Sequence, residues 1–256
     1  MSAIELDGAY NVRDLGGLPT EGGSQTRYGL LYRGDSLDAI SPHDQDTLFH
    51  QLGIGVVVDL RTRPEVAPAA WRDGSVQYYQ FPLISERKMG TEPFPVGQPE
   101  DLGRLYMSNL EDGQEPVRAT LEVLAEHLSK GTPCIVGCAA GRDRTGVIMA
   151  VLLSMLGVTD DAIAQDYSES NRHAAEVALR LASNPLYANG QPPTGYEAIA
   201  VPEAMLAFLR LLRERFSSAR QFALDAGLRP EQVDQLRAAL IEPATDESMQ
   251  DSALVL

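Results

Sequence analysis

The stretch IVGCAAGRDRTGVIMA, residues 135–150, joins two apolar runs through a short loop rich in glycine and charge. The run before Gly137 is typical of a strand, and the run from Thr145 onward is apolar nearly all round, which is typical of a buried helix. A glycine-bearing loop between a strand and a helix directs consecutive backbone N–H groups to one point, and such a site binds phosphate or sulfate oxygens. The stretch therefore predicts an α/β fold with an anion site where this strand ends.

Two side chains give this loop a chemistry. Arg144 carries a planar guanidinium that matches two phosphate oxygens. Cys138 lies at the start of the loop, where a helix N-terminus and neighbouring cations stabilise a thiolate. A thiolate held against a bound phosphorus predicts nucleophilic catalysis of phosphoryl transfer through a phosphocysteine.

The rest of the chain extends this pattern into a sheet. Four segments predict strands: residues 30–34 (LLYRG), 54–60 (IGVVVDL), 76–83 (VQYYQFPL) and 133–137 (PCIVG). The second is a nearly continuous β-branched run, as in a strand buried on both faces of a parallel sheet. A helical stripe of apolar residues at 117, 121, 124 and 128 precedes the last strand. The alternation indicates an α/β fold with a central parallel sheet flanked by helices.

Helices are also expected after the loop. The helix from Thr145 should stop at Gly157, and Thr159 is a suitable N-cap for the next one. Residues 202–216, 217–227 and 229–241 predict three more helices, with Pro230 in the first turn of the last. Residues 85–103 and 183–198 are rich in turn residues, so we expect irregular structure there, either as loops bordering a site or as plain surface loops.

Other glycine-loop chemistries fit the sequence less well. Gly141 and Gly146 have the spacing of a nucleotide-binding loop, but Val147 stands where that motif needs lysine. An aspartate nucleophile at Asp59 would need a second acid where Arg61 stands. The sequence holds no C-x-x-C pair for zinc or redox chemistry.

Length and composition suit one globular unit. The chain has 256 residues, 44% of them hydrophobic, and no linker-like segment divides it. The formal net charge of −15 argues against nucleic acid or an anionic membrane as the main partner. Two cysteines, no leader-like N-terminus and no apolar run long enough to span a bilayer predict a cytoplasmic protein without integral membrane segments.

Four blocks carry a resemblance to a known family: NVRDLGG (residues 11–17), LLYRGDSL (30–37), VVVDLRTRPE (56–65) and CAAGRDRTG (138–146). In this order they resemble the bacterial atypical protein tyrosine and lipid phosphatases, cysteine-based enzymes with a Cys-x5-Arg signature. The resemblance implies a single tyrosine-phosphatase-like domain over residues 1–241. Residues 242–256 hold four acidic groups and no basic one, which predicts a disordered acidic tail. The resemblance also implies a helical lid, which we expect within residues 85–115 and 171–200.

The resemblance assigns roles within the loop. Cys138 is the expected nucleophile and Arg144 the expected phosphate clamp, in a hydrolysis that uses no cofactor. The Thr145 hydroxyl is expected to bond the Cys138 sulfur, with helix capping as the alternative. The expected phosphate-binding positions are Ala139, Ala140, Gly141, Arg142, Thr145 and Gly146.

Gly137 departs from the family pattern, because tyrosine phosphatases nearly always have histidine directly before the cysteine. Glycine has no side chain with which to orient the loop. We therefore expect a smaller thiolate fraction at neutral pH than in a histidine-bearing relative. The alternative function is a catalytically weak phosphate-binding module.

Two aspartates compete to protonate the leaving oxygen, a step that needs a general acid. Asp143 lies within the loop, so its proximity to the site follows from the sequence. Asp59 ends a predicted strand at the edge where ligands gather in parallel sheets, although an ion pair with Arg13 or Arg61 would account for it as well. We rank Asp143 slightly ahead.

The block around Arg13 has two interpretations. Arg13 is a candidate for binding the phosphate, but a structural role is favoured. Gly16 and Gly17 suit a turn, and Asn11 and Asp14 are expected to bond nearby backbone groups.

The substrate is left open by the sequence. A phosphotyrosine protein, a phosphoinositide and a small phosphate ester present the same head group. Arg142 keeps a positive charge that would suit a second phosphate, or it is simply solvated. The four histidines have no ligand spacing, so no metal site is predicted.

Overall fold

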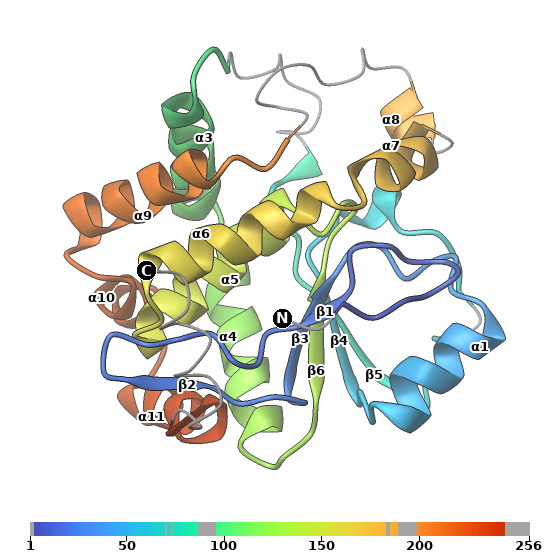
Figure 1. The fold of residues 1–256 in the computed structure, drawn as a ribbon, viewed down its shortest axis with the longest axis horizontal. Helices are drawn as coiled ribbons and strands as arrows, with labels where there is room; N and C mark the ends of the chain where they lie inside the picture. Colours follow the sequence, from blue (N-terminus) through green and yellow to red (C-terminus); the bar gives the residue numbers. More distant parts are fainter. Residues whose placement is uncertain are drawn as a thin grey trace, which may run out of the picture.

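A five-stranded sheet lies at the centre of the computed structural model, which describes residues 3–69, 71–72, 74–86, 96–182, 185–188 and 199–243 (Figure 1). In spatial order the strands are β1 (Arg13–Asp14), β3 (Leu31–Gly34), β6 (Cys134–Gly137), β4 (Val56–Asp59) and β5 (Gln77–Gln80). The last four run parallel, and β1 pairs antiparallel with β3 at one edge. The predicted α/β fold with a mostly parallel central sheet is confirmed.

The central strands are buried on both faces, as the β-branched run predicts. Val56 and Val58 of β4 pack into the larger core cluster, whereas Val57 between them packs into a smaller cluster on the opposite face. Strand β6 alternates in the same way, with Ile135 on the side of Val57. Because successive side chains of a strand point to opposite faces, each central strand contributes to two cores.

Most helices cover one face of the sheet (Figure 1). The helices on that face are α3 (Pro99–Asp112), α4 (Gln114–Leu128), α5 (Asp143–Leu156), α6 (Asp160–Ser168), α9 (Pro202–Phe216), α10 (Ala219–Asp225) and α11 (Pro230–Leu240). None of the helices in the described ranges is long and apolar enough to cross a lipid bilayer.

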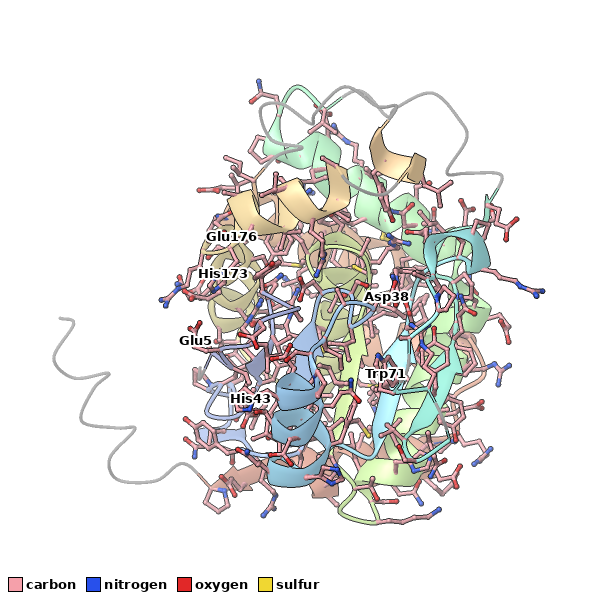
Figure 2. All side chains as sticks on the ribbon, turned by 90° about the vertical axis from the view of Figure 1, so that its right-hand side faces the viewer. Glu5, Asp38, His43, Trp71, His173 and Glu176 are labelled. Atoms are coloured by element: carbon pink, nitrogen blue, oxygen red, sulfur yellow. The ribbon has the colours of Figure 1, made fainter. Side chains whose placement is uncertain are left out.

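The opposite face has a thinner cover. It carries the short α1 (Pro42–Gln45) and a π-helical segment, η1 (Asp46–Gln51). Trp71 packs there and donates its indole N–H to Leu37 O at 2.8 Å. Figure 2 looks onto this face, with Trp71 and Asp38 labelled.

Helix α5 is the most deeply buried helix on the larger face. Residues 144–153 are all buried, and the helix ends at Gly157, whose φ of 86° lies in the left-handed region. Thr159 then caps α6 by accepting a hydrogen bond from Ala162 N. Both predicted helix boundaries are confirmed, because glycine and threonine meet the conformational and capping needs at these positions.

Shorter elements complete the chain. Helical turns η2 (Arg63–Glu65) and η3 (Glu169–Asn171) follow β4 and α6, and η3 leads to α7 (Ala174–Ala182) and α8 (Pro185–Ala188). A second sheet pairs β2 (Ser24–Thr26) with β7 (Ile241–Pro243). The expected tail therefore begins inside a strand, since Glu242 and Pro243 pair with β2. Residues 244–256 lie outside the described residues.

Residues 99–103 differ from the irregular structure expected for them. They form the first turns of α3, with Pro99 at the first helical position, which proline tolerates because that N–H needs no helical partner. Gly103 is there because α9 lies close: a Cβ on Gly103 would sit 2.9 Å from the Ala207 Cβ. Further along α3, Tyr106 and Leu110 are fully buried in the core. This part of the expected lid is a core helix, and residues 87–95 lie outside the described residues.

Candidate active site

The loop after β6 brings a cysteine to the carboxyl edge of the sheet. Cys138 follows directly on the central strand, between β3 and β4, and only 2% of its surface is exposed. Helix α5 begins at Asp143, so the amino end of a buried helix faces the same loop. A helix N-terminus carries partial positive charge, which favours a thiolate or a phosphate beside it.

Three consecutive carbonyls of this loop point outward to side chains from distant parts of the chain. Ala139 O accepts from Arg180 Nη2 (2.7 Å), Ala140 O from Asn11 Nδ2 (2.9 Å) and Gly141 O from Arg33 Nη2 (2.7 Å). In a planar trans peptide the N–H points away from the C=O. The N–H groups that follow these three carbonyls are therefore expected on the inside of the loop, an arrangement typical of an anion-binding concavity.

Gly141 is required by the close approach of the loop to β3. Its φ is +66°, a conformation that side chains rarely adopt. A Cβ at this position would lie 2.5 Å from Gly34 O. The spacing of the two strands therefore leaves room only for glycine here.

A buried ion-pair triad supports the loop from behind. Asp166 of α6 accepts from Arg13 Nε at 2.7 Å and also pairs with Arg33 Nη1. Arg13 in turn donates to Asn11 Oδ1 at 2.5 Å. Arg13 therefore lies behind the loop, bonded to residues that position it, which is the structural role favoured for it. Asn11 differs from expectation: it bonds Ala140, 129 positions away, and not nearby backbone groups.

Arg144 is held by a carboxylate that sequence reasoning did not single out. Its Nη1 and Nη2 donate to Glu65 Oε2 and Oε1 at 2.8 and 2.7 Å. Glu65 also accepts from the backbone N–H and the hydroxyl of Thr62, each at 2.8 Å, and from the Tyr187 hydroxyl. Burial would raise the pKa of Glu65, but Arg144 and these donors lower it to about 2. The pair is thus charged and fixed in a bidentate geometry.

Asp143 lies at the start of α5 with its side chain one-third exposed (33%). Its Oδ1 accepts from the Tyr106 hydroxyl at 2.5 Å, and both oxygens accept from Arg142 Nε at 3.1 Å. Burial opposes ionisation, but Arg142 and Tyr106 together lower the pKa of Asp143 below its ordinary value. Asp143 is therefore ionised in the free protein at neutral pH.

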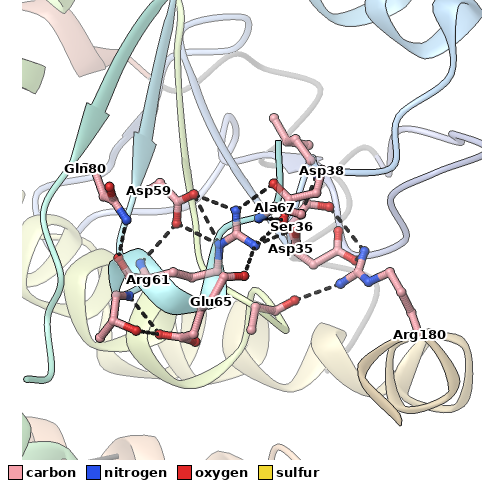
Figure 3. A network of polar contacts seen from close by, with 12 residues as sticks. Asp35, Ser36, Asp38, Asp59, Arg61, Glu65, Ala67, Gln80 and Arg180 are labelled. Atoms are coloured by element: carbon pink, nitrogen blue, oxygen red, sulfur yellow. Dashed lines mark hydrogen bonds and ion pairs between the residues drawn. The ribbon is translucent and has the colours of Figure 1, made fainter. Parts of the chain in front are cut away.

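Asp59 ends β4 and is engaged in a polar network (Figure 3). Arg61 Nε and Nη2 donate to its carboxylate at 2.9 and 2.7 Å, and the Tyr78 hydroxyl donates to Oδ2 at 2.9 Å. The same guanidinium donates to Asp38 at 2.7 Å. The ion pair with Arg61, one of the two interpretations of Asp59, is thus present. Asp59 nevertheless lines the same small cavity as Cys138.

Gly137 lies beside the small cavity that Cys138 lines. The cavity measures about 10 Å³, enough for about one water molecule. A Cβ on Gly137 would lie 3.1 Å from Gly34 O and 3.2 Å from the Asp35 carbonyl oxygen. A side chain at position 137 would therefore need the backbone at the end of β3 to give by a few tenths of an ångström.

Thr145 and Gly146 follow Arg144 within the first turn of α5. The Thr145 hydroxyl is fully buried and has no hydrogen-bond partner among the described residues. Its expected bond to the Cys138 sulfur is therefore absent from this structure, and so is the capping alternative, since α5 begins at Asp143 with Arg142 at its N-cap. Gly146 lies against α6, since a Cβ there would be 3.1 Å from the Tyr167 ring.

Cys134, the second cysteine, lies within strand β6. Both cysteines are free and buried. Burial raises the pKa of Cys134 to about 12, so this thiol stays protonated at neutral pH.

The histidines lie on separate elements and form no cluster among the described residues. Figure 2 shows His43 on α1 and His173 just before α7.

Part of the second expected lid segment lies against the loop. Arg180 of α7 bonds Ser36 O and Ala139 O and pairs with Asp35 at 2.7 Å, as Figure 3 shows. Tyr187 of α8 bonds Glu65. The two short helices thus contact both sides of the site. Residues 183–184 and 189–198 of this segment lie outside the described residues.

Sequence reasoning missed the residues that act on the loop from a distance. They are Asn11, Arg33, Glu65, Tyr106 and Arg180 as partners of the loop or of its charged side chains. Three of them lie inside the blocks that carry the family resemblance, which was the available signal. Their roles were not predictable because their partners lie tens of residues away.

Comparison of the sequence with known proteins identifies the family to which it is similar. A model described as "Tyrosine phosphatase family" matches residues 4–242. The triple specificity protein phosphatase PtpB of Mycobacterium tuberculosis is 27% identical over 282 residues, which cover 94% of this chain and 100% of that protein. A protein of Cupriavidus necator described as a tyrosine-protein phosphatase is 27% identical over 228 residues, 88% of this chain and 79% of that one.

A solved structure is similar over a shorter part. TpbA of P. aeruginosa in complex with phosphotyrosine is 16% identical and covers 66% of this chain and 91% of that one, with a TM-score of 0.30.

Proposed function

Because the chain belongs to the tyrosine phosphatase family, it is a cysteine-dependent hydrolase of phosphate monoesters, and we propose that its reaction passes through a phosphocysteine at Cys138. The observation that carries this proposal is the orientation of the loop. Three carbonyls are bonded outward by Arg180, Asn11 and Arg33, which leaves the intervening N–H groups for phosphate oxygens. Fixed donors that meet developing charge supply most of the catalysis in such sites.

Arg144 adds the second part of the phosphate site. Glu65 takes one N–H from each terminal nitrogen of the guanidinium, which has five N–H donors in all. The remaining donors are available to the equatorial oxygens of the phosphoryl group. Because Glu65 and the phosphate would bind different N–H groups of Arg144, the guanidinium can be oriented before the substrate arrives.

The first step transfers the phosphoryl group to sulfur. The Cys138 thiolate attacks phosphorus, the P–O bond to the leaving group breaks, and Asp143, protonated in the substrate complex, gives its proton to the departing oxygen. A bound phosphate dianion beside Asp143 favours that protonated form, because like charges raise the pKa of a carboxyl.

The second step releases phosphate. Water attacks the phosphocysteine, Asp143 takes the proton from that water, and the sulfur leaves as a thiolate. The proton given up in the first step is thereby regained, and the enzyme returns to its starting state. Asp143 is a better candidate than Asp59 for this general acid and base, because Arg61 binds the Asp59 carboxylate through both Nε and Nη2.

For the substrate we propose phosphotyrosine in proteins. Relatives that align with most of this chain are described as tyrosine-protein phosphatases, and one as a triple specificity phosphatase. Phosphoinositides and small phosphate esters share the head group and are the alternatives that a substrate screen must separate.

The test of the mechanism compares the wild type with Cys138→Ser on p-nitrophenyl phosphate. We expect turnover by the wild type, trapping of a phosphoenzyme on acid quenching, and loss of both in the variant. A chain that binds phosphate but turns over nothing in either form would be a phosphate-binding module. A parallel screen of phosphotyrosine peptides, inositol lipids and sugar or nucleotide monophosphates under EDTA tests the substrate class, and the highest kcat/KM on a non-peptide would overturn it.

A further inference from the structure

Two buried tyrosines form a hydrogen-bonded chain that ends on Asp143. Tyr106 of α3 and Tyr167 of α6 are both fully buried, and their hydroxyl oxygens lie 2.6 Å apart. The Tyr106 hydroxyl lies 2.5 Å from Asp143 Oδ1. Two phenols from different helices thus converge on the carboxylate that the proposed mechanism uses for its proton transfers.

Chemistry fixes which group donates in each hydrogen bond between Tyr167, Tyr106 and Asp143. An ionised carboxylate only accepts hydrogen bonds, so Tyr106 must donate to Asp143. Its single proton is then used, and the Tyr106 oxygen is left to accept from Tyr167. The hydroxyl protons of Tyr167 and Tyr106 therefore both point toward Asp143, and this orientation stabilises its ionised form.

The two oxygens of Asp143 are not equivalent. Oδ1 accepts from Tyr106 and from Arg142 Nε, whereas Oδ2 accepts only from Arg142 Nε at 3.1 Å among the described residues. Oδ2 therefore keeps more of its acceptor capacity, and the partly exposed side chain can present it to a substrate. One oxygen is bound to the protein and the other is open to the reaction.

Charged and titratable groups from four parts of the chain surround Asp143. Arg142 of the loop and Arg144 of α5 are cationic, while Tyr106 of α3 is its hydrogen-bond donor and Tyr167 of α6 supports that donor. Burial, followed by the charge of Asp143, raises the pKa of Tyr106 well above its ordinary value. Tyr106 therefore keeps its proton at every working pH and acts as a donor, not as an acid.

We propose that Tyr106, backed by Tyr167, is a positioning residue that binds Oδ1 of Asp143 and so reserves Oδ2 for proton exchange with the leaving group and with water. This rests on the proposed function of Asp143. In both steps the proton moves on and off Oδ2, and the Tyr106 proton stays on its own oxygen. The hydrogen bond also favours the carboxylate over the acid, so it sets the pH at which Asp143 changes its protonation state.

The experiment measures the kcat profile against pH for Tyr106→Phe, which removes one hydroxyl and keeps the ring packed on Phe208. A hydrogen bond to a charged group is worth about 1.5–3 kcal/mol, which corresponds to a shift of about one to two pH units. We expect the limb that Asp143 controls to move upward by that amount, whichever step limits kcat. Tyr167→Phe should move it in the same direction by less, and it provides the measurement if Tyr106→Phe does not fold.

The chain offers a matched control on the competing aspartate. Tyr78 donates to Asp59 Oδ2 at 2.9 Å, so Tyr78→Phe removes the same group from the other carboxylate. We expect no shift of the limb in this variant. A shift in Tyr78→Phe with none in Tyr106→Phe or Tyr167→Phe would overturn the proposal and point to Asp59.

Phosphoenzyme trapping separates this inference from the proposed function. Tyr106→Phe should still form the phosphocysteine, whereas Cys138→Ser should not. If the variants still form the phosphocysteine and their pH profiles do not move, only the positioning role of Tyr106 is refuted. If the wild type does not form the phosphocysteine, the proposed mechanism itself is refuted.

Discussion

Arg144 and Glu65 hold each other in place beside the phosphate site. Their side chains are 10% and 0% exposed, and each charge would be costly to bury without the other. Two parallel hydrogen bonds offset that cost and fix the plane of the guanidinium. Glu65 therefore sets the angle at which Arg144 meets a phosphoryl group.

Replacing Glu65 with glutamine should impair catalysis while leaving the nucleophile intact. The amide can accept only one of the two hydrogen bonds from Arg144, so the guanidinium loses its fixed plane. A misplacement of about 1 Å near the reacting atoms costs about 100-fold, and we expect kcat/KM to fall by roughly 10- to 100-fold. The control is Glu126→Gln on α4, which removes an exposed pair with Lys130 just beyond the helix; an equal loss of kcat/KM there would contradict the explanation.

The same carboxylate should make part of the stability depend on pH. Glu65 has a folded pKa of about 2 against 4.5 for the ordinary group. Because the folded pKa is depressed, the stabilisation is complete above pH 4.5 and is lost as the pH falls toward 2. The difference in unfolding free energy between wild type and Glu65→Gln should narrow by about 2 kcal/mol between pH 5 and 3. Urea unfolding across that range measures it, and a constant difference would refute it.

Residue roles inside the loop could be argued from the sequence, but the roles of its supporters could not. Cys138 and Arg144 carry their chemistry in their side chains and their spacing. Asn11 and Arg33 instead act through backbone carbonyls 129 and 108 positions away, and no local pattern encodes such a partner.

The elements with strong periodicity were the most predictable. The helix over Pro202–Phe216 has the bounds that its apolar pattern indicates. The strands also appear where expected, although trimmed to four residues each. The two-residue strand β1 and the pairing of β2 with β7 were missed, because strands so short have no period and their pairing depends on partners at the far end of the chain.

Helix α7 should affect catalysis through Arg180. Arg180→Met removes the donor from Ala139 O and the partner of Asp35 while keeping a long apolar stem. We expect kcat to fall about tenfold, since a fixed loop donor is worth about 10²–10³ and this residue holds only one peptide of the loop. Hydrogen exchange of the α7 amides should become faster, because its docking contact is gone.

Arg172→Met is the matched control for α7. Arg172 lies just before the helix, is 68% exposed and pairs with Glu169 on the surface. It should leave both kcat and the exchange of α7 unchanged. Faster exchange in Arg180→Met with unchanged kcat would mean that α7 docks on the loop without ordering it.

The charge of the whole molecule should select among substrates. With 36 acidic and 21 basic side chains, the protein carries a net charge of −15 and repels anions at long range. We expect phosphopeptides with basic flanking residues to show kcat/KM at least about tenfold above those with acidic flanks at low salt. The ratio should shrink toward one at 0.15 M salt, where the screening length is about 8 Å. A ratio that does not respond to salt would mean that contacts at short range, not the overall field, decide the preference.

The narrow gap between β3 and β6 restricts which residues fit at position 137. A side chain at position 137 would begin about 3 Å from two carbonyl oxygens of residues 34 and 35, and residue 35 is also the anchor of α7 through Arg180. A histidine placed at position 137 would press on the backbone that docks that helix. A larger residue at position 137 thus requires these carbonyls to give by a few tenths of an ångström, and its effect on catalysis and on α7 depends on whether residues 34–36 can move that far.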